Sequence, residues 1–217
     1  MKLFETKLTI NRTDISISAK KYICFNDFKT ICLSDLHLGK AGYFSQNNLP
    51  LPVIAHQIDL DNLKEIDILY NAYTILILGD LFHSSNIYEA EELRNIIDKS
   101  KNDWILIKGN HDILDNATYL NMGFKKVFKK YIQKDFCFVH EPNENDLAKY
   151  FCICGHLHPG VILRSKGKQS FSFPCFYKTQ TQLILPAFGS LTGLFFIKPI
   201  KKQTTTIAIC NQRLYEI

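Results

Sequence analysis

Asp, Asn and His residues follow five short apolar segments of this 217-residue chain, and these residue types suit metal binding. Besides Asp112, they supply two carboxylates, one Asn and five His. A nitrogen and oxygen set without thiolate favours Mn, Fe, Zn or Ni over Ca or Cu, and it is large enough to hold two ions. The segments are ICLSDLH (31–37), ILILGD (75–80), ILIKGNHD (105–112), FCFVH (136–140) and FCICGHLH (151–158).

The spacing within these motifs favours shared coordination. Asp35 and His37 are two residues apart, so on an extended chain they share a face and one ion can be held by both. His156 and His158 are also two residues apart and follow a Gly, which makes them a good ligand pair. Asp80 offers two carboxylate oxygens and can bridge two cations. Each motif alone could be an ordinary turn or cap, but their common position after apolar segments favours one site.

The segment Gly109 to Asp112 combines several functions. Asn110 offers a carbonyl oxygen as a neutral ligand, and Gly109 lets the backbone come close to the site. Histidine titrates near neutral pH, so His111 is a candidate general acid for a leaving alkoxide. Asp112 is predicted to orient His111.

The remaining His residues divide by position. His140 ends FCFVH, and its assignment as a ligand depends on the whole set. His83 follows Asp80 closely and is predicted to line the substrate cleft. His56 lies within a predicted helix and is interpreted as a surface or packing residue.

Two transition-metal ions held about 4 Å apart by these residues would clamp a phosphoryl group and lower the pKa of a bridging water toward neutrality. The resulting metal-bridging hydroxide would attack phosphorus in line while the ions offset charge on the equatorial oxygens. The motifs therefore predict a dinuclear phosphoesterase.

The elements that position these residues follow from the apolar pattern. The five segments have strand length and a β-branched or aromatic bias, so they read as buried strands, and ligands in open α/β sheets lie beyond the carboxyl ends of strands. Helices are predicted for 52–70, 88–100 and 114–122, a hairpin for 3–10 and 14–19, and further strands for 161–163, 170–176, 181–185, 194–197 and 205–209.

This order predicts an α/β (α+β) fold with two sheets packed face to face and helices outside, in a single domain spanning 1–217. A hydrophobic fraction of 46% and a charged fraction of 22% are typical of a soluble globular protein. The apolar runs are too short to cross a membrane, and the alternating N-terminus lacks the pattern of a signal peptide. We therefore expect a cytoplasmic protein without a membrane partner.

Cysteines and basic residues are less specific. The seven Cys are odd in number, and four lie in predicted buried strands, which favours core thiols in a reducing compartment over metal ligands. Basic clusters at 125–134, 164–168 and 198–202 can attract phosphate-rich polymers, although a solvated basic surface explains the charge equally well.

The motif order DxH, GD, GNHD, H and GHxH resembles that of the calcineurin-like metallophosphoesterase superfamily. The resemblance implies a four-layer αββα sandwich with two mixed sheets and two divalent transition-metal ions, of which we expect Mn, with Fe, Zn or Ni as alternatives. It also implies the residue roles: one ion for Asp35, His37 and His158, the other for Asn110, His140 and His156, Asp80 as the bridge and His111 as the acid.

A narrower resemblance involves DLHLGKAGYF (35–44), GDLFHS (79–84), 158–177 and LPAFGSLTG (185–193). These segments are similar to bacterial phosphoesterases described as ligase-associated DNA damage response endonucleases. The similarity implies a DNA phosphodiester substrate, a role in DNA repair, and a DNA ligase and helicase as pathway partners. Ser190-Leu191 departs from it, because a more aromatic-rich run is expected there.

Two alternatives stay open. The mild net charge of +5 also suits a phosphatase or phosphodiesterase acting on a small molecule or nucleotide. Polymer binding weakens steeply with salt, which separates these substrates. A non-catalytic interaction scaffold with a degenerate metal site is the third reading, and the complete set of ligand positions argues against it.

Overall fold

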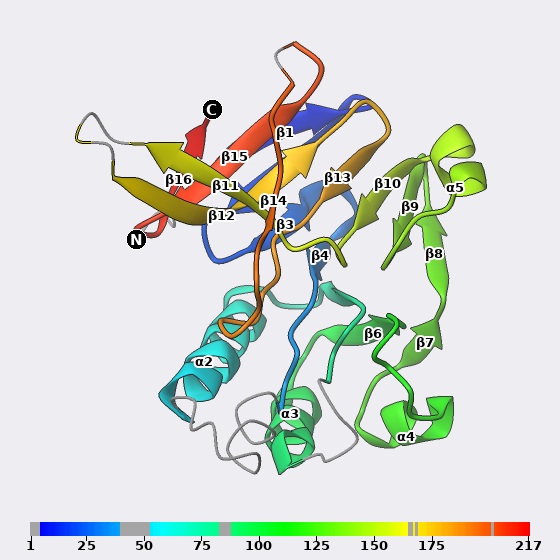
Figure 1. Ribbon diagram of the computed structural model, residues 1–217. Coiled ribbons are helices and arrows are strands. Elements are labelled where there is room, and N and C mark those ends of the chain that lie inside the picture. The colour runs from blue at the N-terminus through cyan, green and yellow to red at the C-terminus, as the bar shows by residue number, and fades with distance from the viewer. Residues whose placement is uncertain (1–4, 40–52, 83–87, 165–166, 168, 201) are drawn as a thin grey trace.

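Two β-sheets pack face to face in the computed structural model, which describes residues 5–39, 53–82, 88–164, 167, 169–200 and 202–217 (Figure 1). In the first sheet the strands follow chain order, antiparallel from β1 to β4 and parallel from β4 to β7. These strands are β1 (Glu5–Ile10), β2 (Thr13–Ser18), β3 (Tyr22–Phe25), β4 (Thr30–Leu33), β5 (Thr74–Leu78), β6 (Asp103–Ile107) and β7 (Lys126–Phe128).

The second sheet has the order β14-β11-β12-β13-β10-β9-β8, and β15 and β16 extend it beside β12. It is mixed, because β9, β10 and β13 are parallel while β12 is antiparallel to β11, β13 and β15. Its strands are β8 (Lys130–Gln133), β9 (Phe136–Val139), β10 (Phe151–Cys154), β11 (Pro159–Arg164), β12 (Ser170–Lys178), β13 (Gln182–Ile184), β14 (Phe195–Phe196), β15 (Thr205–Cys210) and β16 (Arg213–Glu216).

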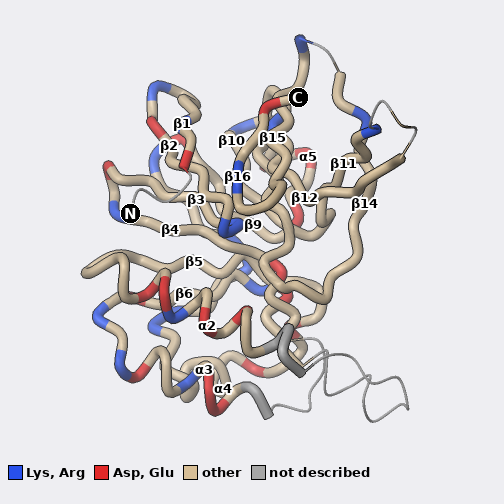
Figure 2. Tube along the Cα trace, turned by 90° about the vertical axis from the view of Figure 1, so that its left-hand side faces the viewer, with Lys and Arg blue, Asp and Glu red and all other residues tan. Residues whose placement is uncertain are grey.

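Helices flank both sheets, as predicted. Three of them, α2 (Val53–Leu69), α3 (Tyr88–Lys99) and α4 (Asn116–Asn121), lie together on the side of the first sheet (Figures 1 and 2). The second sheet is flanked by α5 (Glu144–Lys149), from which Leu147 packs against the buried Cys152 and Cys154. The expected αββα order therefore holds, but six helical residues form the fourth layer among the described parts of the chain.

Alternation along the strands builds two cores. In β4, Ile31 and Leu33 belong to the core between the first sheet and the helices, while Cys32 belongs to the core between the sheets. The inter-sheet core includes the rings of Phe25 and Phe138, whose centroids are 5.5 Å apart. This two-sided burial explains why these strands are continuously apolar.

The three predicted helices and the first hairpin are confirmed, with small shifts at their ends. The third helix begins at Asn116 and not at Leu114, because the Asp115 carboxylate accepts a 2.7 Å hydrogen bond from the Thr118 amide and caps it. β3, β7, β8, β16 and α5 were not predicted. They have three to six residues each, too few for a periodic pattern to stand out.

Burial also tests the reading of the cysteines. Six of the seven are buried, Cys210 is partly buried, and all seven are free. This confirms the expected core thiols. Among the described helices, none combines the length and apolar character needed to cross a membrane.

Candidate metal centre

Five strand ends meet between the two sheets, as the motifs predict. The first sheet contributes the residues that follow β4, β5 and β6, and the second contributes those that follow β9 and β10. All the predicted site residues lie in these five loops, at 35–37, 80, 110–112, 140 and 156–158. The site therefore belongs to both sheets.

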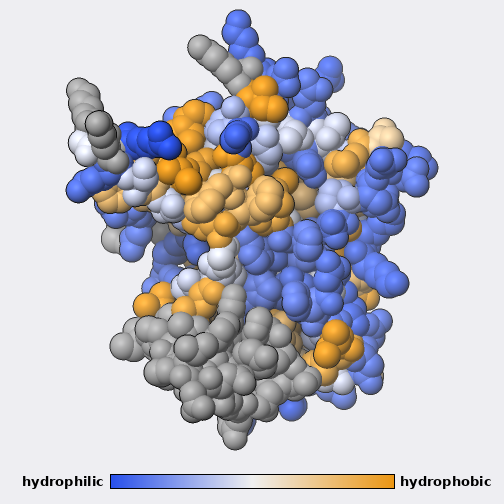
Figure 3. Space-filling view, in the orientation of Figure 1, coloured by the Kyte–Doolittle hydropathy of each residue, from blue (hydrophilic) through white to orange (hydrophobic). Residues whose placement is uncertain are grey.

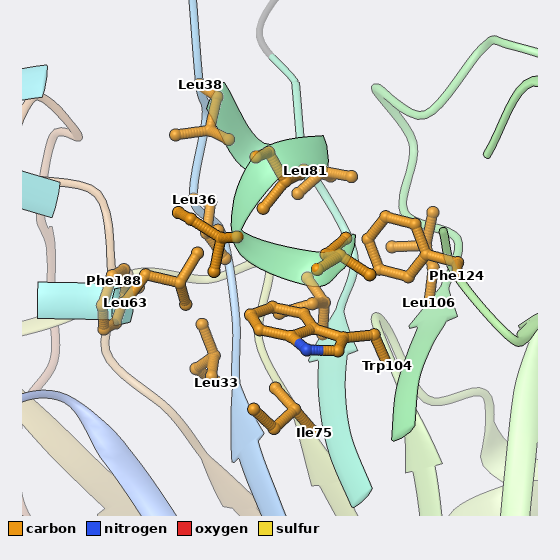
Figure 4. Packing of buried hydrophobic residues seen from close by; sticks show 14 of the residues in the cluster. Leu33, Leu36, Leu38, Leu63, Ile75, Leu81, Trp104, Leu106, Phe124 and Phe188 are labelled. Carbon is orange, nitrogen blue, oxygen red and sulfur yellow. The ribbon is translucent and has the colours of Figure 1, made fainter. Parts of the chain in front are cut away.

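Buried leucines fix the direction of two of these loops. Leu36 and Leu81 are almost fully buried and point into the core between the first sheet and the helices (Figure 4). Because Leu36 and Leu81 occupy the side of these loops that faces this core, the neighbouring side chains of Asp35, His37 and Asp80 point to the opposite side. Each loop is thus held by an apolar side chain next to a site residue.

The backbone is strained at most of the predicted ligands. Asp35, His37, Asp80, His156 and His158 have φ angles of 56°, 46°, 51°, 68° and 51°. Residues other than glycine rarely adopt positive φ, and such strained positions cluster at functional sites. No sequence pattern predicts a positive φ angle at Asp or His.

Two glycines permit the close approach of these loops. A side chain at Gly109 would overlap the carboxylate of Asp80, and one at Gly155 would overlap Ser34. The predicted role of Gly109 in allowing close backbone approach is confirmed. The glycine before His156 serves the same purpose for the loop that follows β10.

The first cluster consists of Asp35, His37 and His158. The His158 Nε2 atom lies 3.2 Å from Asp35 Oδ1 and 3.4 Å from His37 Nε2. One potential ligand atom from each residue lies within 4.8 Å of the others. We call this group the first triad.

The second cluster consists of Asp80, His140 and His156, which we call the second triad. The His140 Nε2 atom lies 3.4 Å from Asp80 Oδ1 and 3.2 Å from His156 Nδ1. Again one ligand atom from each residue lies within 4.8 Å of the others. Asn110 is exposed beside His140. Both residues line one cavity, whose volume is about 440 Å³.

The donor atoms of both triads suit metal ions. In each triad two imidazole nitrogens face each other at hydrogen-bond distance, and a carboxylate oxygen lies beside them. Such a convergence of nitrogen and oxygen lone pairs is typical of a transition-metal site. Asp80 connects the two, because its Oδ1 atom faces His140 while its Oδ2 atom lies 3.8 Å from His37 Nε2.

The electrostatics reflect the crowding of these groups. Burial works to raise the pKa of Asp80, but the hydrogen bond and positive charge of His140 outweigh it and lower that pKa overall. For His140, burial works to lower the pKa, yet the hydrogen bond to Asp80 and the charges of Asp35 and Asp80 raise it to about 9. Without metal, the pair therefore carries a proton that a metal ion must displace.

Hydrogen bonds orient the predicted ligands. His140 Nδ1 lies 2.8 Å from the Leu78 carbonyl, which favours the N–H at this atom and leaves Nε2 for the site. The Ser34 hydroxyl lies 2.6 Å from the Asp35 carboxylate, which also accepts a 3.0 Å bond from the His156 amide. Ser34 was not predicted, since a Ser before Asp is too common to stand out.

Asp112 and His111 occupy different surroundings. The buried carboxylate of Asp112 accepts hydrogen bonds of 3.0 and 2.8 Å from the Leu81 and Gly109 amides and so holds two site loops together. Burial raises the pKa of Asp112. His111 is exposed, with its ring centroid 5.7 Å from that of His37. The orienting of His111 by Asp112 stays a prediction.

A loop from the C-terminal half braces the first triad. The Phe188 and Gly189 amides donate to the carbonyls of Ser34 and Asp35 at 2.8 and 3.1 Å. On the far side of this loop, the carboxylate of Asp59 in α2 accepts from the Ser190 amide at 2.8 Å and from its hydroxyl. Ser190, which departs from the narrower resemblance, is therefore a structural contact.

Two further predictions concern the remaining histidines and the basic clusters, and the structure tests them only in part. His83 and the side chain of His56 lie outside the described residues. In the basic cluster at 125–134, Lys125 pairs with Asp103 and Lys130 with Asp146, so part of that charge is already neutralised.

This fold and site define the class of the protein, a two-sheet protein with two candidate metal sites. The family profile for calcineurin-like phosphoesterases matches residues 28–192, and the chain belongs to this family, whose members use divalent metals. The protein is therefore a hydrolase of phosphoesters. Comparison with curated proteins found no match.

A solved structure of a nuclease shows the same fold. The nuclease MPE from Pseudomonas putida is similar with a TM-score of 0.80 and 21% identity, over 98% of this chain and 100% of that chain. The protein of unknown function AQ665 from Aquifex aeolicus has a TM-score of 0.42 and 21% identity, over 59% of this chain and 78% of that chain. At such identities, the likeness to the nuclease establishes the fold.

Proposed function

We propose that this chain is a dinuclear metal-dependent phosphodiesterase that cleaves DNA. The observation that carries this proposal is the position of Asp80, whose two carboxylate oxygens face different triads. A bridging carboxylate between two triads is what a two-ion site requires. Because the chain belongs to a phosphoesterase family, the bond that is broken is a phosphoester bond.

In this proposal Asp35, His37 and His158 hold one ion, and Asn110, His140 and His156 hold the other, with Asp80 as the bridge. The nitrogen and oxygen donors suit Mn first, with Fe, Zn or Ni as alternatives. Two bound ions supply an activated water and offset the negative charge of the phosphate.

The protein itself supplies proton transfer and alignment. His111 lies at the exposed rim beside the first triad, where it can donate a proton to the leaving oxygen of a bound phosphodiester. Asp112 keeps this loop in place through the Gly109 and Leu81 amides. The strained backbone at Asp35 and His37 keeps both side chains directed at the first ion site.

The choice of DNA has separate support. The similar structure from Pseudomonas putida is that of a nuclease, and exposed lysines of the chain can meet a polyanion. The cavity beside His140, lined by Lys108, Asn110 and Lys129, favours a second candidate, a phosphodiester or phosphomonoester of one nucleotide. The cytoplasmic location, the single domain, the role in repair, and the ligase and helicase partners stay predictions.

The test compares three substrates with one preparation loaded with Mn. A DNA oligonucleotide, bis(p-nitrophenyl) phosphate and p-nitrophenyl phosphate report polymer, small diester and monoester hydrolysis. We expect oligonucleotide cleavage that falls by at least about 100-fold in Asp80→Asn and persists in Asp61→Asn, which changes an exposed carboxylate of α2.

Monoester turnover without cleavage of any nucleic acid would exclude the nuclease assignment and favour the small-molecule enzyme. An Asp80→Asn variant as active as wild type would exclude the site itself.

A further inference from the structure

The outer face of the second sheet is only partly covered. α5 packs over β9 and β10, but β11, β12 and β14 continue beyond it, and no helix among the described residues lies on them (Figure 1). Large aromatic side chains are exposed here: Phe171 is 49% exposed and Phe195 57%. Figure 3 shows apolar side chains gathered over these strands, next to a hydrophilic surface.

The strand registers place these rings on one face. Phe171 and Phe173 are two residues apart in β12, and their rings stack with centroids 6.5 Å apart. Phe195 is two residues before Ile197 and therefore shares its face. That face carries a small buried cluster of Val161, Cys175 and Ala208, against which Phe173 and Ile197 pack. We call the rings of Phe171, Phe173 and Phe195 the aromatic face.

The positive charge of the protein comes from the same part of the chain. Residues 159–217 contain eight Lys and Arg and a single acidic residue, Glu216. Residues 1–158 contain 18 Lys and Arg and 20 Asp and Glu. The segment that forms the aromatic face is thus strongly basic, while the segment that carries the metal centre is slightly acidic. Arg213 is exposed on the same face, because it pairs with Cys210, two residues after the buried Ala208.

The aromatic face is continuous with the first triad. β11 begins at Pro159, directly after His158, and Phe195 pairs with Pro159 in the sheet. The Phe195 amide donates a 2.9 Å hydrogen bond to the His158 carbonyl. The first exposed ring therefore lies one strand away from a predicted metal ligand.

We propose that the aromatic face binds unpaired nucleotides of a nucleic-acid strand whose scissile phosphodiester lies at the metal centre. This inference rests on the proposed function and adds the place where the strand is held. Bases stack on exposed aromatic rings whatever their sequence, and basic side chains meet the phosphates. Bases within a duplex are already stacked, so the face selects unpaired nucleotides. A second copy of this chain would instead bring like charges together.

Two neighbouring residues provide a matched test. Phe195 and Phe196 are both exposed, at 57% and 48%, and both belong to β14. Because side chains alternate along a strand, they lie on opposite faces of the sheet. Phe195→Ala removes a ring of the aromatic face, whereas Phe196→Ala removes the same chemistry from the other face.

Fluorescence anisotropy with a labelled oligothymidine strand measures the binding. EDTA in the buffer prevents cleavage and removes the contribution of metal. We expect Phe195→Ala to weaken binding by about five-fold or more, the effect of losing one stacked base, and Phe196→Ala to change it less than two-fold. Affinity for a blunt duplex should be equal in both variants. Thermal unfolding checks that both are folded.

Three results would overturn the inference. They are equal affinities of the two variants for the single strand, an equal loss of duplex affinity in Phe195→Ala, and a wild-type dimer that Phe195→Ala dissociates. These failures are distinct from failure of the proposed function, in which wild-type protein with Mn cleaves no oligonucleotide but hydrolyses a small diester.

Discussion

Replacing Ser190 with Ala should loosen the loop that braces Asp35. The Ser190 hydroxyl donates to the buried carboxylate of Asp59, while the preceding amides of Phe188 and Gly189 bond to the loop after β4. The substitution keeps the amide bond at 2.8 Å and removes only the hydroxyl. It therefore isolates one hydrogen bond between α2 and the loop that braces the metal centre.

A hydrogen bond to a charged acceptor contributes about 1.5–3 kcal/mol. Ser190 is itself exposed, so water can replace part of the interaction, and we expect the lower part of this range. For a protein of this size, about 2 kcal/mol corresponds to a fall in Tm of about 4–8 °C. Looser support of Asp35 should also weaken metal binding at the first triad.

Thermal unfolding of metal-free protein, followed by circular dichroism, measures the change. Thr192→Ala is the control, because its hydroxyl donates to the neutral Gly189 carbonyl at 2.9 Å in the same loop. A Ser190→Ala protein that melts within 1 °C of the Thr192→Ala protein would refute the reasoning that Asp59 braces this loop.

Three other perturbations test separate parts of the site. Leu36→Ala should cost about 2–5 kcal/mol in urea unfolding, because it empties the buried anchor beside Asp35, and a loss below 1 kcal/mol would contradict that role. The pKa of His140 is raised to about 9 in metal-free protein, so metal binding at pH 7 should release a proton and tighten as the pH rises to 9. Calorimetry in two buffers measures this proton release, and binding without release of a proton would contradict the prediction. His111→Ala should slow cleavage of DNA, with its poor leaving group, about 100-fold or more, but p-nitrophenyl diesters far less; equal losses would exclude His111 as the acid.

Much of the fold was predictable because the chain marks its buried strands clearly. An apolar run that ends in Asp, Asn or His predicts both the position of a strand and the end at which its polar side chains lie. Short elements such as α5 were missed, since their stability comes from packing and from the cap at Asn143 and not from periodicity.

The geometry of the site was less accessible. Spacing alone did not divide the ligands between two triads; that division came from the family resemblance. The left-handed backbone at Asp35 and Asp80 has no local signal, because tertiary contacts impose it. The bond between Asp59 and Ser190 joins residues 131 positions apart, and no pattern within either segment reveals it.

The central claim is that two triads hold two ions, and metal content per chain tests it most directly. Wild-type protein, dialysed after loading with Mn, should retain two ions per chain by inductively coupled plasma mass spectrometry. His158→Ala and His140→Ala, each lacking one imidazole of one triad, should retain one. A wild-type protein with at most one ion, or variants that both keep two, would contradict the account.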